Sequence, residues 1–114
     1  MMIDELLEDV RGLAIEEMNR ANLIHPPFHS RHEGVAVIEE EVRECEAEMT
    51  AVKDIHEWVK TWVFVDEITK ADKAIERLED RANQLAAEAI QVAAMCKKWR
   101  RSFVSEVSCK ENDS

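Results

Sequence analysis

Apolar residues recur at alternating steps of three and four over most of the chain between Val35 and Phe103. This spacing places one apolar row along a helix and is typical of helices that pack together over many turns. The 114 residues include only two glycines and two prolines, too few turn formers for a many-stranded fold. The pattern predicts an all-α protein made of few, long helices.

Three helices are expected. The first ends at His25-Pro26-Pro27, because a proline pushes the residue before it away from helical angles. Ser30 and Glu33 form a capping box, so the second helix is expected to start near Arg31. Asp66 is the expected N-cap of the third. The predicted apolar rows are Ile3, Leu6, Leu7, Val10, Leu13, Ala14, Met18 and Ala21; then Val35, Ile38, Val42, Cys45, Met49, Val52, Ile55, Val59 and Trp62; then Ile68, Ala71, Ile75, Leu78, Ala82, Leu85, Ala89, Val92, Cys96, Trp99 and Phe103.

The second and third helices are predicted to form a long antiparallel hairpin. A single helix through Asp66 would leave its apolar row uncovered by its own chain. At ~1.5 Å per residue, each of these helices would span about 50 Å. Residues 1–104 are expected to form one domain, and residues 105–114, which lack periodicity, a flexible C-terminal tail.

The charge of the chain limits its partners. The net charge is −10, which disfavours nucleic acid or an anionic membrane as the main partner and suits cations, or an anion presented together with a cation. No apolar run approaches the roughly 18 residues of a membrane span, and the acidic start does not resemble a secretory signal. The three cysteines are widely spaced and odd in number, so a reduced, cytoplasmic protein is expected.

Acidic residues at helical spacing form two clusters that are expected to meet. At ~100° per residue, Glu41 lies about 60° to one side of the second helix's apolar row and Glu44 about 120° to the same side. Glu88 and Gln91 have the same two offsets on the third helix. Equal offsets put both clusters on one side of an antiparallel hairpin, and position 66 lies midway between them along the chain. A tight turn at Asp66 therefore brings them opposite each other.

Converging carboxylates repel one another, and such clusters usually persist because a cation sits among them. Oxygen ligands select hard ions, which makes Mg²⁺ the first candidate and Mn²⁺ the second. A metal held by a few carboxylates, with open positions, grips di- and triphosphates and activates water. The alternative is that Glu39, Glu40, Glu41 and Glu44 form only a solvated helix face.

Two sequence blocks carry a resemblance to a known family. Glu40-Glu41-Val42-Arg43-Glu44 matches a Glu-Glu-x-x-Glu motif in full, and Glu88-Ala89-Ile90-Gln91 matches Glu-x-x-Asp in its first position. With the flanking residues 28–38 and 92–95, these blocks resemble the MazG-like, all-α nucleoside triphosphate pyrophosphohydrolases, in particular a phage- and prophage-associated branch. The resemblance covers roughly residues 1–104.

The resemblance implies a fold, a metal site and a reaction. The fold is a four-helix-bundle core completed by oligomerisation, as a dimer or tetramer. Glu41, Glu44 and Glu88 would bind Mg²⁺, with Gln91 at the fourth ligand position. The substrate would be a nucleoside or deoxynucleoside triphosphate, cleaved to the monophosphate and pyrophosphate. Glu40 or Glu44 would accept a proton from the attacking water.

Two departures from the family pattern support a second hypothesis. Gln91 replaces an aspartate, so the site has one negative charge fewer. Residues 45–87 separate the motifs, which is longer than the family's usual interval and extends the hairpin outward. The chain would then be a catalytically weak or inactive helical bundle that binds nucleotides or a protein partner. Magnesium-dependent turnover distinguishes the two hypotheses.

Residues outside the acidic clusters have two interpretations each. Lys97 and Lys98 either grip phosphate or, with the arginines that follow them, complement the dipole at the end of the third helix. His32 either borders the nucleotide pocket or stabilises the start of the second helix. The aromatic residues near the hairpin tip favour a subunit contact over a cofactor site; they are Trp58, Trp62 and Phe64.

Overall fold

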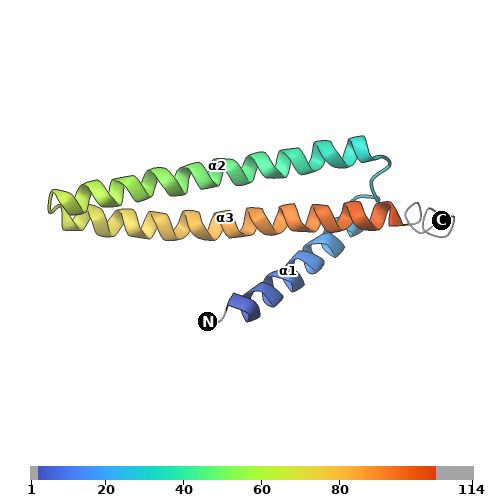
Figure 1. Cartoon of the computed structure of the whole chain (residues 1–114), viewed down its shortest axis with the longest axis horizontal. Helices are drawn as coiled ribbons and strands as arrows, with labels where there is room; N and C mark the ends of the chain where they lie inside the picture. Colours follow the sequence, from blue (N-terminus) through green and yellow to red (C-terminus); the bar gives the residue numbers. More distant parts are fainter. Residues whose placement is uncertain (1–2, 105–114) are drawn as a thin grey trace. The chain divides into compact units, whose positions relative to one another are not determined.

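Three helices make up the computed structural model, which describes residues 3–104 (Figure 1). Helix α1 spans Ile3–Ile24, α2 spans Arg31–Phe64 and α3 spans Ile68–Ser102. No strand occurs within residues 3–104, so the all-α class is confirmed. None of these helices is both long and apolar enough to cross a membrane, as judged over the same residues. The tail predicted for residues 105–114 lies outside the described residues.

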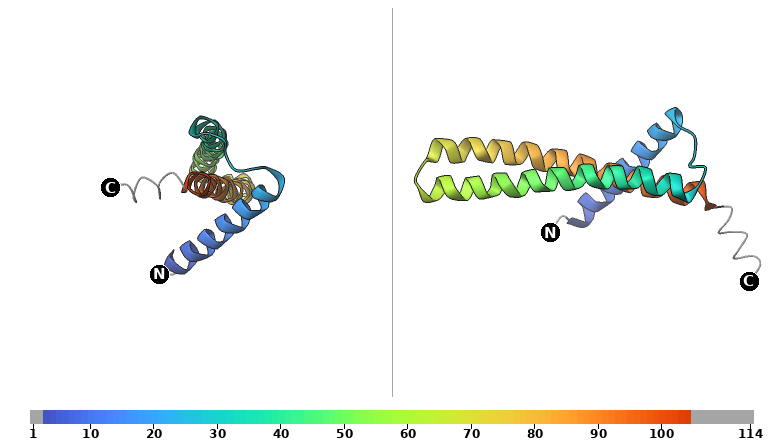
Figure 2. Two further views of the ribbon diagram at one scale, coloured as in Figure 1. Left: turned by 90° about the vertical axis from the view of Figure 1, so that its right-hand side faces the viewer. Right: turned by 90° about the horizontal axis from the view of Figure 1, so that it is seen from above.

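The chain divides into two compact units that both draw on α2 and α3. Unit 1 comprises Met1–Glu41 and Ile90–Ser114, and unit 2 comprises Val42–Ala89. Unit 2 is a helical hairpin. Its two helical segments run side by side in opposite directions in Figure 1 and in the right-hand view of Figure 2, as the sequence predicts.

The start of α2 is capped by the two residues expected from the sequence. The N–H of Glu33 donates to Oγ of Ser30 at 3.1 Å, which satisfies one of the free donors of the first turn. The Glu33 carboxylate accepts a hydrogen bond from the N–H of His29 at 3.2 Å, one residue earlier than in the usual capping box. The predicted start at Arg31 is confirmed.

The turn between α2 and α3 differs from the prediction for Asp66. Asp66 has a φ of 57°, in the left-handed region. Its N–H donates to the carbonyl of Val63 at 3.1 Å, and the N–H of Glu67 donates to that of Trp62 at 2.9 Å. These two bonds form a Schellman motif, which ends α2. Asp66 therefore terminates α2 and does not cap α3, because an aspartate tolerates left-handed angles.

The core of unit 1 joins α1, the connection after it, the start of α2 and the end of α3. Met18 is 1% exposed and Ala94 fully buried, and both belong to one cluster with Phe28, Met95 and Phe103. The N–H of Phe28 donates to Oγ of Ser102 at 3.0 Å, which ties the α1–α2 connection to the end of α3. This bond and the burial of Phe28 anchor the connection to the core.

Gly34 allows a close approach between α2 and the indole of Trp99. A Cβ at position 34 would lie 2.6 Å from Cε3 of Trp99 and 3.3 Å from Cδ2 of Phe28. Real Cβ atoms essentially never lie under 3.0 Å from another heavy atom, so the contact with Trp99 could not form without a shift. Gly34 is therefore required by packing.

The core of unit 2 is narrow. Ile55 of α2 and Ala71 and Ala74 of α3 are its buried residues. Small alanine side chains let two helices come close together. Two cations of α3 lie over tryptophan rings of α2. Cζ of Arg77 is 5.2 Å from the ring centre of Trp58, and Nζ of Lys70 is 4.6 Å from the ring centre of Trp62.

The predicted apolar rows are buried only in part. Among the large apolar residues of those rows, several remain exposed: Ile3, Leu6, Leu7, Leu13, Val35, Met49, Ile68 and Ile75. A contact between two helices covers one side of an apolar row and leaves its flanks open. Ala74 and Ala94, which lie outside the predicted rows, are buried instead.

The two glycines give a matched test of the close approach at Gly34. A Cβ at Gly12 would have no atom within 4 Å, so Gly12→Ala should raise the free energy of unfolding by about 1 kcal/mol through helix propensity. Gly34→Ala should be less stable than Gly12→Ala by about 1–3 kcal/mol, because Trp99 has to move. Urea unfolding of both variants measures the difference. Equal stabilisation by the two substitutions would contradict the packing described at Gly34.

Candidate functional site

The acidic stretch of α2 places several carboxylates on one side of the helix. Glu41, Glu44 and Glu48 follow one another at steps of three and four, so each lies one turn from the next. Glu41 is the last α2 residue of unit 1, and Glu44 and Glu48 belong to unit 2. Because α2 is continuous from Arg31 to Phe64, the helix itself holds Glu41 one turn from Glu44.

Glu88 of α3 meets this row. One carboxylate oxygen of each of Glu41, Glu44 and Glu88 lies within 4.8 Å of those of the other two. Glu41 and Glu88 are half-buried and Glu44 is exposed, so the group opens to solvent on one side. The structure therefore brings together the three carboxylates that the sequence predicts to converge. We call these three residues the acidic triad.

Glu48, the next carboxylate of the row, has a different partner. Arg81 of α3 donates from Nη1 to both carboxylate oxygens of Glu48, at 3.3 and 3.4 Å. The Glu48 side chain is 19% exposed and that of Arg81 43%, so water partly screens this pair. The pair lies one turn beyond Glu44 and links α2 to α3 next to the triad.

Gln84 holds the carboxylate of Glu88. Its Nε2 donates to Oε1 of Glu88 at 3.1 Å from one turn earlier on α3. The bond restricts the rotation of Glu88 and leaves its second oxygen available to a ligand. Gln84 is not among the site residues predicted from the sequence, although a glutamine four residues before a glutamate is a known stabilising pair on helices.

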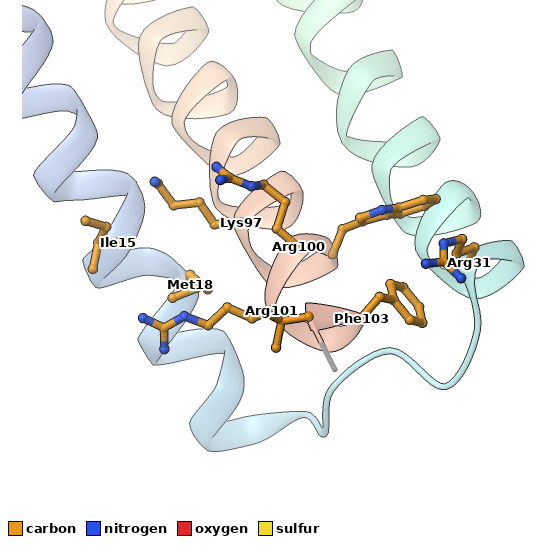
Figure 3. Close-up of a pocket in the computed structure, with 9 residues that line it drawn as sticks. Ile15, Met18, Arg31, Lys97, Arg100, Arg101 and Phe103 are labelled. Carbon is orange, nitrogen blue, oxygen red and sulfur yellow. The ribbon is translucent and has the colours of Figure 1, made fainter. Parts of the chain in front are cut away.

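The other predicted site residues lie outside the triad. Glu40 and His32 are exposed on α2, and Gln91 is half-buried one turn after Glu88. Lys98 is 5% exposed, with Nζ 4.8 Å from the ring centre of Phe28, inside unit 1. Lys97 lines a pocket of unit 1, drawn in Figure 3.

The donor set of the triad fits a hard divalent cation. Carboxylate oxygens are the ligands that Mg²⁺ and Mn²⁺ prefer, and neither sulfur nor imidazole belongs to the triad. Three ionised carboxylates at this separation repel one another, and a bound divalent cation reverses that interaction. Mg²⁺ usually retains several waters beside a few carboxylates, which suits a group open to solvent.

Comparison with known proteins adds no relative. A scan against protein-family models and searches of curated proteins and of solved structures found no match to this chain.

Magnesium should stabilise the chain through the triad. At a Mg²⁺ concentration one hundred times the dissociation constant, one site adds about 2.7 kcal/mol to the free energy of unfolding. Glu41→Gln with Glu44→Gln should abolish this gain, because two of the three charged ligands become neutral. Thermal unfolding with and without Mg²⁺ measures it.

A matched control separates the triad from general surface charge. Glu76 and Glu79 have the same spacing on α3, are both exposed and lie outside the triad. Glu76→Gln with Glu79→Gln should retain the full Mg²⁺ effect. If both double variants respond to Mg²⁺ as the parent does, the triad is not the binding site.

Proposed function

We propose that this chain is a metal-dependent nucleoside triphosphate pyrophosphohydrolase of the MazG-like type. The observation that carries the proposal is the approach of Glu41, Glu44 and Glu88 to within 4.8 Å of one another. The motif Glu40-Glu41-x-x-Glu44 supports it from the sequence. The free thiols of Cys45 and Cys96 fit a reducing, cytoplasmic location.

Glu41, Glu44 and Glu88 would hold Mg²⁺ or Mn²⁺, and Gln91 would offer a carbonyl oxygen from the next turn of α3. A bound divalent cation neutralises phosphate charge and lowers the pKa of water. Gln84 fixes the Glu88 carboxylate before any ligand arrives, through its 3.1 Å hydrogen bond. Such preorganisation reduces what binding has to order.

The proposed reaction consumes one water for each triphosphate. The water oxygen attacks phosphorus, the bond between the α- and β-phosphates breaks, and the products are a monophosphate and pyrophosphate. Glu40 lies next to Glu41 on α2 and is exposed, so it is available to accept the proton that water loses. Glu44 is the second candidate for this role, since it is the exposed member of the triad.

A second copy of the chain is proposed to complete the helical core. The support is the number of exposed apolar residues on α1, among them Leu6 and Leu7, which are 57% and 42% exposed. Apolar side chains grouped in this way mark protein contacts. Light scattering at micromolar concentration should give at least twice the mass of one chain. The mass of a single chain would contradict this part of the proposal.

Pyrophosphate release tests the proposed activity. A panel of nucleoside and deoxynucleoside triphosphates should yield monophosphate and pyrophosphate only when Mg²⁺ or Mn²⁺ is present. Glu44→Gln should reduce kcat/KM by about a hundredfold or more, since it removes a charged ligand or the proton acceptor. Glu79→Gln is the control and should retain the parent rate.

A gain-of-function variant tests the proposed activity even where the turnover rate of the parent chain is low. Gln91→Asp restores the carboxylate of the family motif and should tighten Mg²⁺ binding by about tenfold, as ligand charge sets cation affinity. Gln91→Asn should not. If neither the parent nor Gln91→Asp releases pyrophosphate while both are folded, the enzyme proposal is wrong.

The second candidate function is a nucleotide- or protein-binding bundle without turnover. Gln91 supports this candidate, because it stands where the family pattern has an aspartate and gives the site one negative charge fewer. The exposed aromatic residues near the hairpin tip support it as well, since Phe64 is 84% and Trp58 45% exposed. Failure of the release assay would leave this candidate as the better account.

A further inference from the structure

Unit 1 contains a pocket of about 610 Å³ between α1, the start of α2 and the end of α3. Ligand pockets of small molecules fall between about 300 and 1,000 Å³. Its lining residues are Ile15, Met18, Arg31, Lys97, Trp99, Arg100, Arg101, Phe103 and Val104. Figure 3 shows the cationic side chains coming from the first turn of α2 and the last turns of α3, with Ile15 and Met18 on α1.

The apolar part of the pocket is already in place. Met18 and Phe103 are 1% and 8% exposed and belong to the core of unit 1. The Trp99 and Phe103 rings meet edge to face, with centres 5.7 Å apart. An apolar body would therefore meet a wall that needs no rearrangement, which favours binding.

The polar side chains of the pocket are all hydrogen-bond donors. Its polar side chains are three arginines, one lysine and the indole of Trp99, and none of these has a hydrogen-bond acceptor. Among residues 3–104, no acidic residue lines the pocket, although the chain as a whole has a net charge of −10. These side chains therefore favour a ligand with a negatively charged group that accepts hydrogen bonds.

The helix dipole explains part of this cationic set but not all of it. Lys97, Arg100 and Arg101 lie in the last turns of α3, where cations are favourable. Arg31 is the first residue of α2, where a cation is unfavourable. Its guanidinium lies 4.5 Å from the ring centre of Phe103, so the packing holds it at the pocket.

A nucleotide is a poor match for this lining. A nucleobase edge presents donors as well as acceptors, and its donors would have no side-chain acceptor here. Buried donors without partners cost about 1–3 kcal/mol each. A hydrocarbon body has no such groups.

We propose that this pocket binds an amphiphilic anion, that is, one carboxylate or phosphate group on a hydrocarbon body. The anionic group meets Lys97, Arg100, Arg101 and Arg31, and the hydrocarbon body packs against Ile15, Met18 and Phe103. This site is separate from the proposed hydrolytic function and does not depend on the acidic triad.

Calorimetry on the full chain with four probes tests the proposal. Decanoate and decyl phosphate should each bind, because they combine a charge with a hydrocarbon body. Decanol lacks the charge and inorganic phosphate lacks the body, so each should bind at least tenfold more weakly. The Met18 methyl signal in an NMR spectrum should shift with decanoate, which locates the ligand.

Two double variants complete the test. Arg100 and Arg101 are exposed, so Arg100→Gln with Arg101→Gln should fold normally and weaken decanoate binding about tenfold or more. Lys53→Gln with Lys73→Gln makes the same charge change at exposed positions of unit 2 and should leave the affinity unchanged. Circular dichroism checks the fold of each variant.

Three results would overturn the proposal: equal binding of decanol and decanoate, equal loss of affinity in both double variants, or displacement of decanoate by ATP at lower concentration. None of them depends on Mg²⁺, so the outcome is independent of the pyrophosphate assay.

Discussion

The tight turn at Asp66 determines which side chains of α2 and α3 face each other. The Schellman bonds at Asp66 and Glu67 end α2, and α3 begins one residue later at Ile68. One more residue inside either helix would rotate the remainder by ~100° and advance it by ~1.5 Å. Glu44 and Glu88 lie at opposite ends of unit 2 along the chain, so their approach depends on every residue between them staying in register.

The acidic triad and the pocket of unit 1 have opposite electrostatic surroundings. The triad gathers carboxylates, and Arg81 takes up Glu48 on the next turn. Within the described part of the chain, the pocket of unit 1 is lined by cations and by no acidic residue. We propose a divalent cation for the triad and an amphiphilic anion for the pocket, so the net charge of −10 describes neither site by itself.

Local rules predicted much of the fold and the composition of the triad. The capping residues Ser30 and Glu33 and the apolar spacing are local, which is why the start of α2 and the hairpin follow from the sequence. The triad follows from helical angles and a turn at position 66. The role of Asp66 was predicted wrongly, because an aspartate between two helices can cap the second or, in left-handed angles, end the first.

Features that depend on three-dimensional packing could not be read from the sequence. Burial of Ala74, Ala94 and Lys98 depends on how the helices rotate against each other. Small alanine side chains and the long apolar stem of a lysine fit buried as well as exposed positions, so the sequence pattern does not indicate their burial. The pocket of unit 1 is likewise lined by residues of three helices, so it depends on their packing. The measurement that tests the central claim most directly is anomalous diffraction from crystals soaked in Mn²⁺. An anomalous peak is expected among the carboxylates of Glu41, Glu44 and Glu88, and ordered carboxylates without a peak there would rule out a cation site.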